Sequence, residues 1–250
     1  MKAIYEPAGR AREYAPLAVN LYQGDCPMAC RYCWSRAFNK RTGRCGPYTL
    51  KPGILEALER EAPRYSGDPR RVLLCFTGDP YPPCDNYATR LALQVLRDRE
   101  VRFSVLTKAA WRAAEDFDLY RCGPDGDWFG QTFAVTNEAQ RYDWEPGASH
   151  IGDRMDAARE ARRRGIYTWA SLEPVIFPAQ MLEFIPVLAQ CIDEFRVGKL
   201  NYMTPPEPVD WERFALDAVE VLQATGRRWK LKRDLAGLLP EGVPSEGGSA

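Results

Sequence analysis

The chain alternates short apolar runs with stripes of apolar residues at helical spacing. Runs bounded by turn residues predict strands at residues 17–22, 72–76, 101–106, 129–135, 166–172, 195–198 and 228–232. Apolar positions three and four apart predict helices between them, at residues 52–62, 111–120, 149–164, 181–188 and 211–222. Asp85 is a suitable cap for a further helix, and residues 123–126 indicate a tight turn.

This order of elements predicts the fold class. Repeated strand–helix units with right-handed crossovers favour an α/β fold whose parallel sheet curls into a partial (β/α)6 barrel. We expect one core domain over residues 1–239 and, from its Gly, Ser and Pro content, a flexible tail over residues 240–250. Reactive groups in such folds collect at the carboxyl ends of the strands, so the loops there are the places to search for a site.

Composition excludes several classes of protein. The 250 residues carry 34 Lys and Arg against 34 Asp and Glu, so no global charge attracts nucleic acid or an anionic membrane. No apolar run approaches the roughly 20 residues that span a bilayer, and the N-terminus lacks the apolar core of a signal peptide, which predicts a cytoplasmic protein without membrane contact. The 8 cysteines are therefore expected to be reduced rather than paired in disulfides.

Three of these cysteines, Cys26, Cys30 and Cys33, follow the first predicted strand with the spacing Cys-x3-Cys-x2-Cys. Soft thiolates in one short loop favour zinc or an iron–sulfur cluster. A structural zinc site needs four closed ligands, but the chain has one Cys-x-x-Cys here and a single histidine, His150, which is better explained as a helix-start or surface residue. Three cysteines on a cubane cluster leave one iron without a protein ligand, and that open position indicates chemistry.

The cysteine spacing, with Tyr32 just before the last cysteine, resembles the signature of the radical S-adenosylmethionine (SAM) enzymes. Further segments are similar to the spore photoproduct lyase branch of that superfamily. They are Phe76-Thr-Gly-Asp-Pro-Tyr-Pro-Pro83, Trp144-Glu-Pro-Gly-Ala148, Arg154-Met155, Arg164-Gly-Ile166 and Ala170-Ser-Leu-Glu-Pro-Val175. The resemblance covers roughly residues 17–202 and implies a partial barrel of the radical SAM type.

The resemblance also implies roles for residues at the strand ends. Cys26, Cys30 and Cys33 would hold a [4Fe-4S] cluster, with Tyr32 near the adenine of SAM. Thr77, Gly78 and Asp79 would meet the methionine amino group, and Lys108 its carboxylate or the ribose. Further cofactor and substrate contacts are expected from Thr136 and Asn137 near the ribose, Glu173 near the adenine or substrate, and Lys199 and Asn201 near the substrate.

The implied reaction is reductive cleavage of SAM to a 5′-deoxyadenosyl radical, which abstracts hydrogen from the substrate. It requires a one-electron donor of flavodoxin or ferredoxin type. The likeness suggests a modified pyrimidine base in DNA as substrate, while a small molecule or a peptide stays open. Aromatic and basic residues are candidates for stacking and phosphate contacts, namely Tyr81, Trp144, Trp169, residues 162–164 and residues 227–233.

The other cysteines leave alternatives open. The reactive cysteine of spore photoproduct lyases falls at or beside Thr77, which puts lyase activity in doubt, and Cys75 in its apolar run is most simply a core residue. Cys45 and Cys84 are candidates for a reactive thiol or a fourth ligand. A closed cluster would indicate an electron carrier, and a closed zinc site an interaction module, in place of an enzyme.

Overall fold

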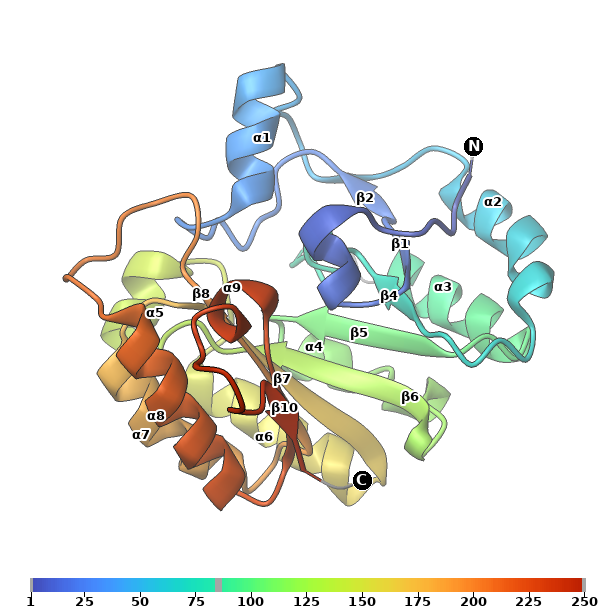
Figure 1. The fold of residues 1–250 in the computed structure, drawn as a ribbon. Helices are drawn as coiled ribbons and strands as arrows, with labels where there is room; N and C mark the ends of the chain where they lie inside the picture. The colour runs from blue at the N-terminus through green and yellow to red at the C-terminus, as the bar shows by residue number, and fades with distance from the viewer. Residues whose placement is uncertain (1, 84–86, 249–250) are drawn as a thin grey trace.

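A twisted, mostly parallel sheet forms the centre of the molecule in the computed structural model, which describes residues 2–83 and 87–248 (Figure 1). Its strand order is β1-β4-β5-β6-β7-β8-β9-β10, and only β10 runs antiparallel to its neighbour. The strands are β1 (Leu17–Val19), β4 (Val72–Leu74), β5 (Phe103–Thr107), β6 (Gly123–Thr132), β7 (Ile166–Val175), β8 (Glu194–Lys199), β9 (Arg228–Leu231) and β10 (Glu246–Gly247). A separate hairpin pairs β2 (Tyr22–Gln23) with β3 (Thr49–Leu50).

Helices cover the outer face of the curled sheet, whereas α1 stands apart from it (Figure 1). They are α1 (Trp34–Thr42), α2 (Ile54–Glu61), α3 (Tyr87–Asp98), α4 (Trp111–Ala114), α5 (Glu138–Trp144), α6 (Ile151–Arg163), α7 (Pro178–Leu188), α8 (Trp211–Ala224) and α9 (Arg233–Ala236), with 3-10 turns at Gly9–Glu13, Ala62–Tyr65 and Phe117–Leu119. Helix α8 shows why they pack there, because its buried Phe214, Ala218 and Leu222 recur every four residues on one face.

Alternation along the strands divides residues between the outer core and the inside of the barrel. On β7, Ala170 and Leu172 pack outward, whereas Trp169, Ser171 and Glu173 face inward. Gly130 on β6 makes room for this inner layer, since a Cβ there would lie 2.4 Å from the Trp169 ring. The alternation therefore directs every second residue of a strand toward the mouth of the barrel.

The predicted α/β partial barrel is confirmed, with two local corrections. The turn predicted at 123–126 is wrong, because these residues begin β6, where the pairing with β7 shifts register between Gly123 and Trp128. The helix predicted at 111–120 ends as α4 at Ala114 and continues as the 3-10 turn Phe117–Leu119. The cap predicted at Asp85 lies outside the described residues.

The two ends of the chain complete the open barrel. The N-terminal segment pairs Tyr5 with Ala18 on β1 and reaches the other side through the Tyr14 carbonyl, which accepts a hydrogen bond from Arg196 of β8 at 2.6 Å. The prediction of a flexible tail does not hold at Glu246–Gly247, which form β10 against β9. The Leu231 amide donates to the Ser245 carbonyl at 2.8 Å, so backbone pairing orders a segment whose composition predicts disorder.

Candidate active site

A cavity of about 400 Å³ opens at the carboxyl ends of the strands. The barrel brings eleven of the thirteen predicted site residues to its wall: Cys26, Cys30, Tyr32, Cys33, Thr77, Gly78, Asp79, Lys108, Glu173, Lys199 and Asn201. These residues come from five separate segments of the chain. Their convergence follows from the parallel sheet, because the loops after parallel strands meet at one edge.

The three cysteines form one side of this cavity. Burial raises the pKa of Cys26 to about 12 and that of Cys30 to about 11. Such thiols ionise at neutral pH only beside strong positive charge, such as that of a metal ion or cluster. Among the described residues, no three His, Cys, Asp or Glu side chains converge where a single ion would bind. Ligands of a cubane bind different irons and are spaced more widely than ligands of one ion.

The segment Trp144–Gly147 holds the cysteine loop in place. The Arg31 amide donates to the Trp144 carbonyl at 2.9 Å, and the Gly147 amide donates to the Met28 carbonyl at 3.1 Å. A Cβ on Gly147 would lie 2.1 Å from the Pro27 carbonyl oxygen, so this approach requires glycine. The cysteine loop is therefore paired by backbone hydrogen bonds to a segment far away in the sequence.

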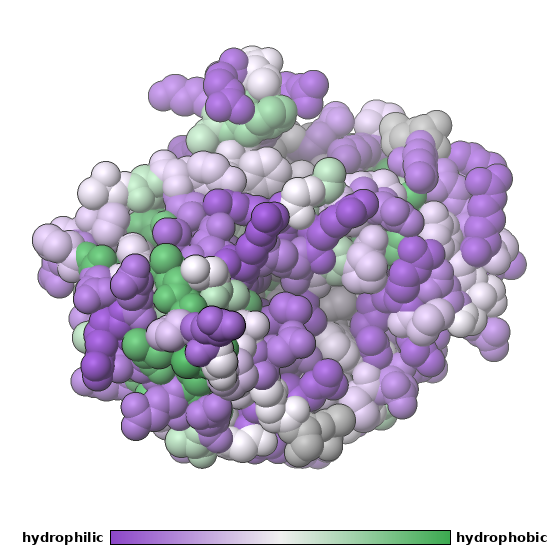
Figure 2. All heavy atoms as spheres, viewed as in Figure 1, coloured by the Kyte–Doolittle hydropathy of each residue, from purple (hydrophilic) through white to green (hydrophobic). Residues whose placement is uncertain are grey.

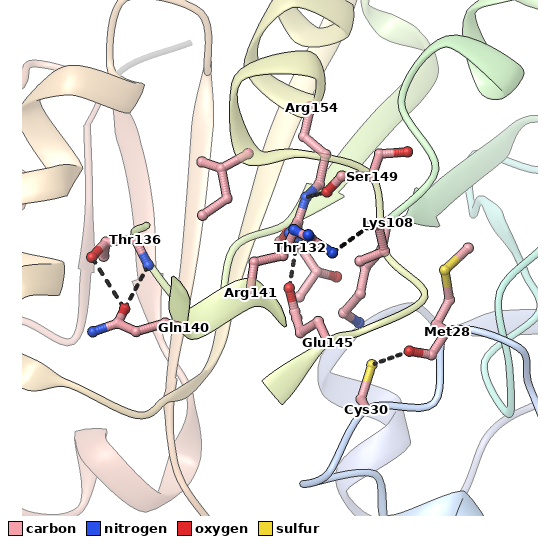
Figure 3. A network of polar contacts seen from close by, with 12 residues as sticks. Met28, Cys30, Lys108, Thr132, Thr136, Gln140, Arg141, Glu145, Ser149 and Arg154 are labelled. Atoms are coloured by element: carbon pink, nitrogen blue, oxygen red, sulfur yellow. Dashed lines mark hydrogen bonds and ion pairs between the residues drawn. The ribbon is translucent and has the colours of Figure 1, made fainter. Parts of the chain in front are cut away.

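A buried ion pair supports the same loop from below. Glu145 and Arg154 have fully buried side chains, and Arg154 Nη1 lies 2.9 Å from Glu145 Oε2 (Figure 3). Arg154 also donates to the carbonyls of Thr132 at 2.7 Å and Ser149 at 3.0 Å. The Tyr32 hydroxyl donates to Glu145, which ties the cysteine loop to this pair. Since breaking a buried pair leaves an uncompensated charge, the arrangement resists movement of the loop.

Asp79 occupies the floor of the cavity with its carboxylate already bonded. It accepts hydrogen bonds from Thr107 Oγ1 at 2.6 Å and from the amides of Tyr81 at 2.9 Å and Lys108 at 2.8 Å. Tyr48 donates to the Asp79 carbonyl at 2.9 Å and fills the space beside Gly78, where a Cβ would lie 2.2 Å from the Tyr48 hydroxyl. The loop at residues 77–79 is thus fixed from both sides.

Lys108 is the cation on the cysteine side of the cavity. Its Nζ lies 5.6 Å from the centre of the Tyr32 ring, on the face that can attract a cation. Burial opposes its charge, but Cys30, Glu145 and Asp79 together raise the pKa of Lys108 above its usual value. The amine is therefore protonated at neutral pH and suited to pair with a carboxylate.

Glu173 belongs to the opposite wall, and its partners come from the two ends of the chain. Tyr14 donates its hydroxyl to Glu173, and Lys232 donates its ammonium to the same carboxylate oxygen. Gly198 on β8 leaves space for this group, since a Cβ there would lie 2.8 Å from the Glu173 carboxyl. Burial lowers the pKa of Lys232 to about 8, although the negative charge of Glu173 opposes that shift.

Two predicted residues are not brought to the cavity. Asn137 caps α5, where its Oδ1 accepts from the Gln140 amide at 3.0 Å, and the Thr136 hydroxyl donates to Gln180 at 3.0 Å. The loop after β6 carries both side chains away from the opening. Thr132, at the end of β6, and Ser171, on β7, line the cavity instead. The proposed ribose contacts of Thr136 and Asn137 therefore do not fit this geometry.

Several residues predicted to contact nucleic acid are engaged elsewhere. Tyr81 and Trp169 are fully buried, and the Tyr81 hydroxyl donates to Asp116 at 3.0 Å. In the basic run 162–164, Arg162 pairs with Asp193, while Arg163 and Arg164 both pair with Glu160. In the run 227–233, Lys232 is buried against Glu173. These groups are not available as a continuous phosphate-binding surface.

Sequence reasoning missed the partners that hold the site. Glu145 and Arg154 lie in segments singled out for their resemblance, yet their pairing joins residues that nothing in the local pattern connects. Tyr14 comes from a segment without a predicted element, and Lys232 from a predicted strand within a run that was a candidate for phosphate contacts.

The fold is similar to those of SuiB and of spore photoproduct lyase. SuiB of Streptococcus suis bound to SAM aligns with a TM-score of 0.61 at 12% identity, over 86% of this chain and 45% of SuiB. A mutant of spore photoproduct lyase with dinucleoside spore photoproduct aligns with a TM-score of 0.62 at 17% identity, over 88% of this chain and 63% of the lyase. SuiB bound to its precursor peptide SuiA gives a TM-score of 0.63 at 12% identity, over 86% and 48% of the two chains.

These similarities confirm the predicted relationship to spore photoproduct lyase at the level of the fold. The chain spans less than two thirds of the length of each of these structures. No protein-family model matches the sequence, and a search of curated proteins found no sequence match. In the described part of the chain, no helix has the length and apolar character to cross a bilayer.

Proposed function

We propose that this protein is a radical SAM enzyme. Cys26, Cys30 and Cys33 would hold a [4Fe-4S] cluster and leave one iron for the amino and carboxylate groups of SAM. When bound and reduced by a one-electron donor, the cluster supplies the electron that cleaves SAM to methionine and a 5′-deoxyadenosyl radical. The observation that supports this most strongly is that the thiols of Cys26, Cys30 and Cys33, the ammonium of Lys108 and the buried carboxylate of Asp79 lie on the wall of a single cavity.

The residues present fit these groups chemically. Three thiols at the opening supply soft ligands for iron, and the ring of Tyr32 lies beside them as a surface for the adenine. Lys108 offers a cation to the methionine carboxylate, and the residues 77–79 offer carbonyl oxygens to its ammonium group. The apolar inner layer around Phe76 and Leu106 would keep water away from the radical.

For the substrate we propose a nucleobase, and in particular a modified pyrimidine in DNA. Two exposed aromatic rings at the cavity support this, since Trp34 is 41% exposed and Tyr202 is 78% exposed. Arg10 lies over the Tyr202 ring at 5.4 Å. Exposed flat rings suit stacking with a base, whereas Arg10 is itself paired with Asp234 at 2.8 Å. Glu173, Lys199 and Asn201 are then the polar groups that would contact the base. A peptide or a small molecule is the alternative, and SuiB, which has the same fold, binds a peptide.

The test is anaerobic reconstitution with iron and sulfide, followed by chemical reduction in the presence of SAM. The proposal predicts about four irons per chain, as a cubane requires, and formation of 5′-deoxyadenosine and methionine. A protein that takes up a full cluster but leaves SAM intact would contradict it. Addition of DNA that carries modified pyrimidines, or of peptides, then identifies the substrate through increased 5′-deoxyadenosine formation and label transfer from the substrate carbon.

A further inference from the structure

Helix α1 carries an unbalanced positive charge beside the cysteine loop. The chain has no net charge, yet residues 26–55 contain no Asp or Glu and include the cations Arg31, Arg36, Lys40, Arg41, Arg44 and Lys51. The five from Arg31 to Arg44 are exposed. We call these five residues the α1 basic surface. Figure 2 shows hydrophilic side chains, in purple, on the projecting tip of the molecule at α1, with paler and hydrophobic residues between and below them.

The cations of the α1 basic surface have no carboxylate partner among the described residues. Arg31 lies over the Trp144 ring at 5.3 Å, and Arg41 and Arg44 lie over the Phe38 ring at 5.7 Å and 5.6 Å. Arg36 donates to the Ala29 carbonyl at 3.3 Å. Elsewhere the pattern is different, because fifteen other arginines lie within 4.0 Å of an acidic group, from Arg10 through Arg228. Five exposed cations without an acidic partner among the described residues thus gather within residues 31–44, on α1 and in the loops at its two ends.

The helix separates part of this charge from the cavity. Trp34 and Ser35, in its first turn, line the cavity. At about 100° per residue, Arg36 and Lys40 lie about 200° and 240° around the axis from Trp34, on the opposite face, whereas Arg41 lies at about 340°, on the Trp34 face two turns further along. A molecule inside the cavity therefore meets Trp34, whereas one that approaches the opposite face of α1 from outside meets Arg36 and Lys40.

The α1 basic surface is also next to the predicted cluster. Cys33 is the N-cap residue of α1, and Arg31 lies between Cys30 and Cys33 in the loop itself. We infer that the α1 basic surface is the docking site of the reductant, a small acidic one-electron carrier of flavodoxin or ferredoxin type. This inference rests on the proposed function. In this step the reduced carrier loses one electron and the cluster gains one, with no atom transferred to the enzyme.

Charge and position together favour this occupant over the substrate. A carrier with an acidic surface around its redox group is complementary to five unpaired cations, and such complementarity accelerates association. Electron transfer requires the two redox groups to come close, and α1 begins at a cluster ligand. A nucleic-acid strand that enters the cavity would be held first by the mouth, where Trp34, Tyr202 and Arg10 lie, and not by the face turned away from it.

The experiment compares two charge-reversed proteins by anaerobic stopped flow. The first is the triple variant Arg36→Glu, Lys40→Glu and Arg44→Glu. The control is Arg64→Glu, Arg97→Glu and Arg99→Glu, which reverses three exposed charges near α2 and α3 and gives the same net charge. Cluster reduction is followed after mixing with photoreduced flavodoxin of acidic surface, and separately with dithionite. Iron content and circular dichroism verify that both variants are folded and loaded.

We expect reduction by flavodoxin to slow about tenfold or more in the α1 variant at about 0.02 M salt, and the difference to shrink at about 0.5 M salt. The control variant should resemble the wild type. Equal flavodoxin rates in the α1 variant and the wild type would overturn the inference. The inference would also be overturned if the α1 variant kept the wild-type flavodoxin rate but no longer bound a fluorescent DNA oligonucleotide or an acidic peptide. The surface would then bind the substrate.

Dithionite separates this inference from the proposed function. If dithionite supports SAM cleavage in all three proteins while flavodoxin reduces them equally, only the docking site is wrong. If the wild type loads no cluster or cleaves no SAM with dithionite, the proposed function itself fails, and the docking inference fails with it.

Discussion

The two walls of the cavity are built in different ways. On the wall that carries the cysteines, Asp79 and the cysteine loop are held largely by backbone amides and carbonyls of neighbouring strand-end loops. On the wall that carries Glu173, the bonds join side chains, and the partners Tyr14 and Lys232 come from outside the strand–helix units. The bonds between main-chain groups of the cysteine loop and of Trp144–Gly147 do not depend on side-chain identity, and the Asp79 carboxylate accepts from two main-chain amides, so the first wall is suited to a constant cofactor. The second wall changes with single substitutions and is suited to a variable substrate.

The largest expected effect is on the cysteine wall. Replacement of Cys26, Cys30 or Cys33 by Ser should reduce 5′-deoxyadenosine formation to the protein-free background, because a cubane left with two ligands is not retained. Iron and sulfide content per chain, with product formation, is the measurement. The controls are Cys45→Ser and Cys122→Ser, which change exposed thiols that do not line the cavity. Loss of iron in Cys45→Ser would instead identify a fourth ligand and a closed cluster.

The second-largest expected effect is on the buried Glu145–Arg154 pair, which supports the cysteine loop. Glu145→Ala leaves Arg154 as a buried unpaired cation, so the free energy of unfolding should fall by about 3 to 5 kcal/mol. Urea denaturation followed by circular dichroism measures this loss. Asp156→Ala removes a surface pair with Arg159 and should cost about 0.5 kcal/mol. Similar losses in both variants would mean that the cysteine wall is no better supported than the surface.

On the wall that carries Glu173, the contribution of Lys232 to the free energy of unfolding should depend on pH. In the folded protein the pKa of Lys232 is about 8, against 10.5 without its surroundings. Between these values the unfolded chain binds a proton that the folded chain does not, so this contribution to stability increases as pH rises from about 8 to 10.5. The unfolding free energy of the wild type relative to Lys232→Met should thus increase by about 3 kcal/mol across that interval. A difference independent of pH would exclude the lowered pKa.

The smallest expected effect is on SAM binding, which should depend on Lys108 in the cavity and not on Thr136 outside it. Lys108→Met should weaken SAM binding about 10-fold to 100-fold, because a charge-assisted contact of about 1.5 to 3 kcal/mol is lost. Equilibrium dialysis of the reconstituted protein with labelled SAM is the measurement. Thr136→Val, at a residue bonded to Gln180 outside the cavity, should bind SAM as the wild type does. A larger loss in Thr136→Val than in Lys108→Met would restore the ribose role predicted from the sequence.

The same contrast between the walls explains what the sequence could predict. The strands at 72–76 and 166–172 were predictable because fully buried parallel strands are continuous apolar runs. The site residues 77–79 and Glu173 were predictable with them, since they come directly after these runs in the sequence. Helix α1 was not predictable from an apolar stripe, since it projects from the sheet and only Ser35 of its residues is buried. The contacts of Glu173 with Tyr14 and Lys232 depend on how the chain ends close the barrel, which local patterns do not encode. Thr136 and Asn137 do not line the cavity, because a resemblance in sequence order does not fix the path of a loop.

The most direct test of the central claim is electron–nuclear double resonance on the reduced, reconstituted protein mixed with SAM that carries nitrogen-15 in its amino group. The account predicts hyperfine coupling between that nitrogen and the cluster, as expected for an amino group bound to an iron without a protein ligand. A fully loaded cluster that shows no such coupling, with SAM bound elsewhere or not at all, would contradict it.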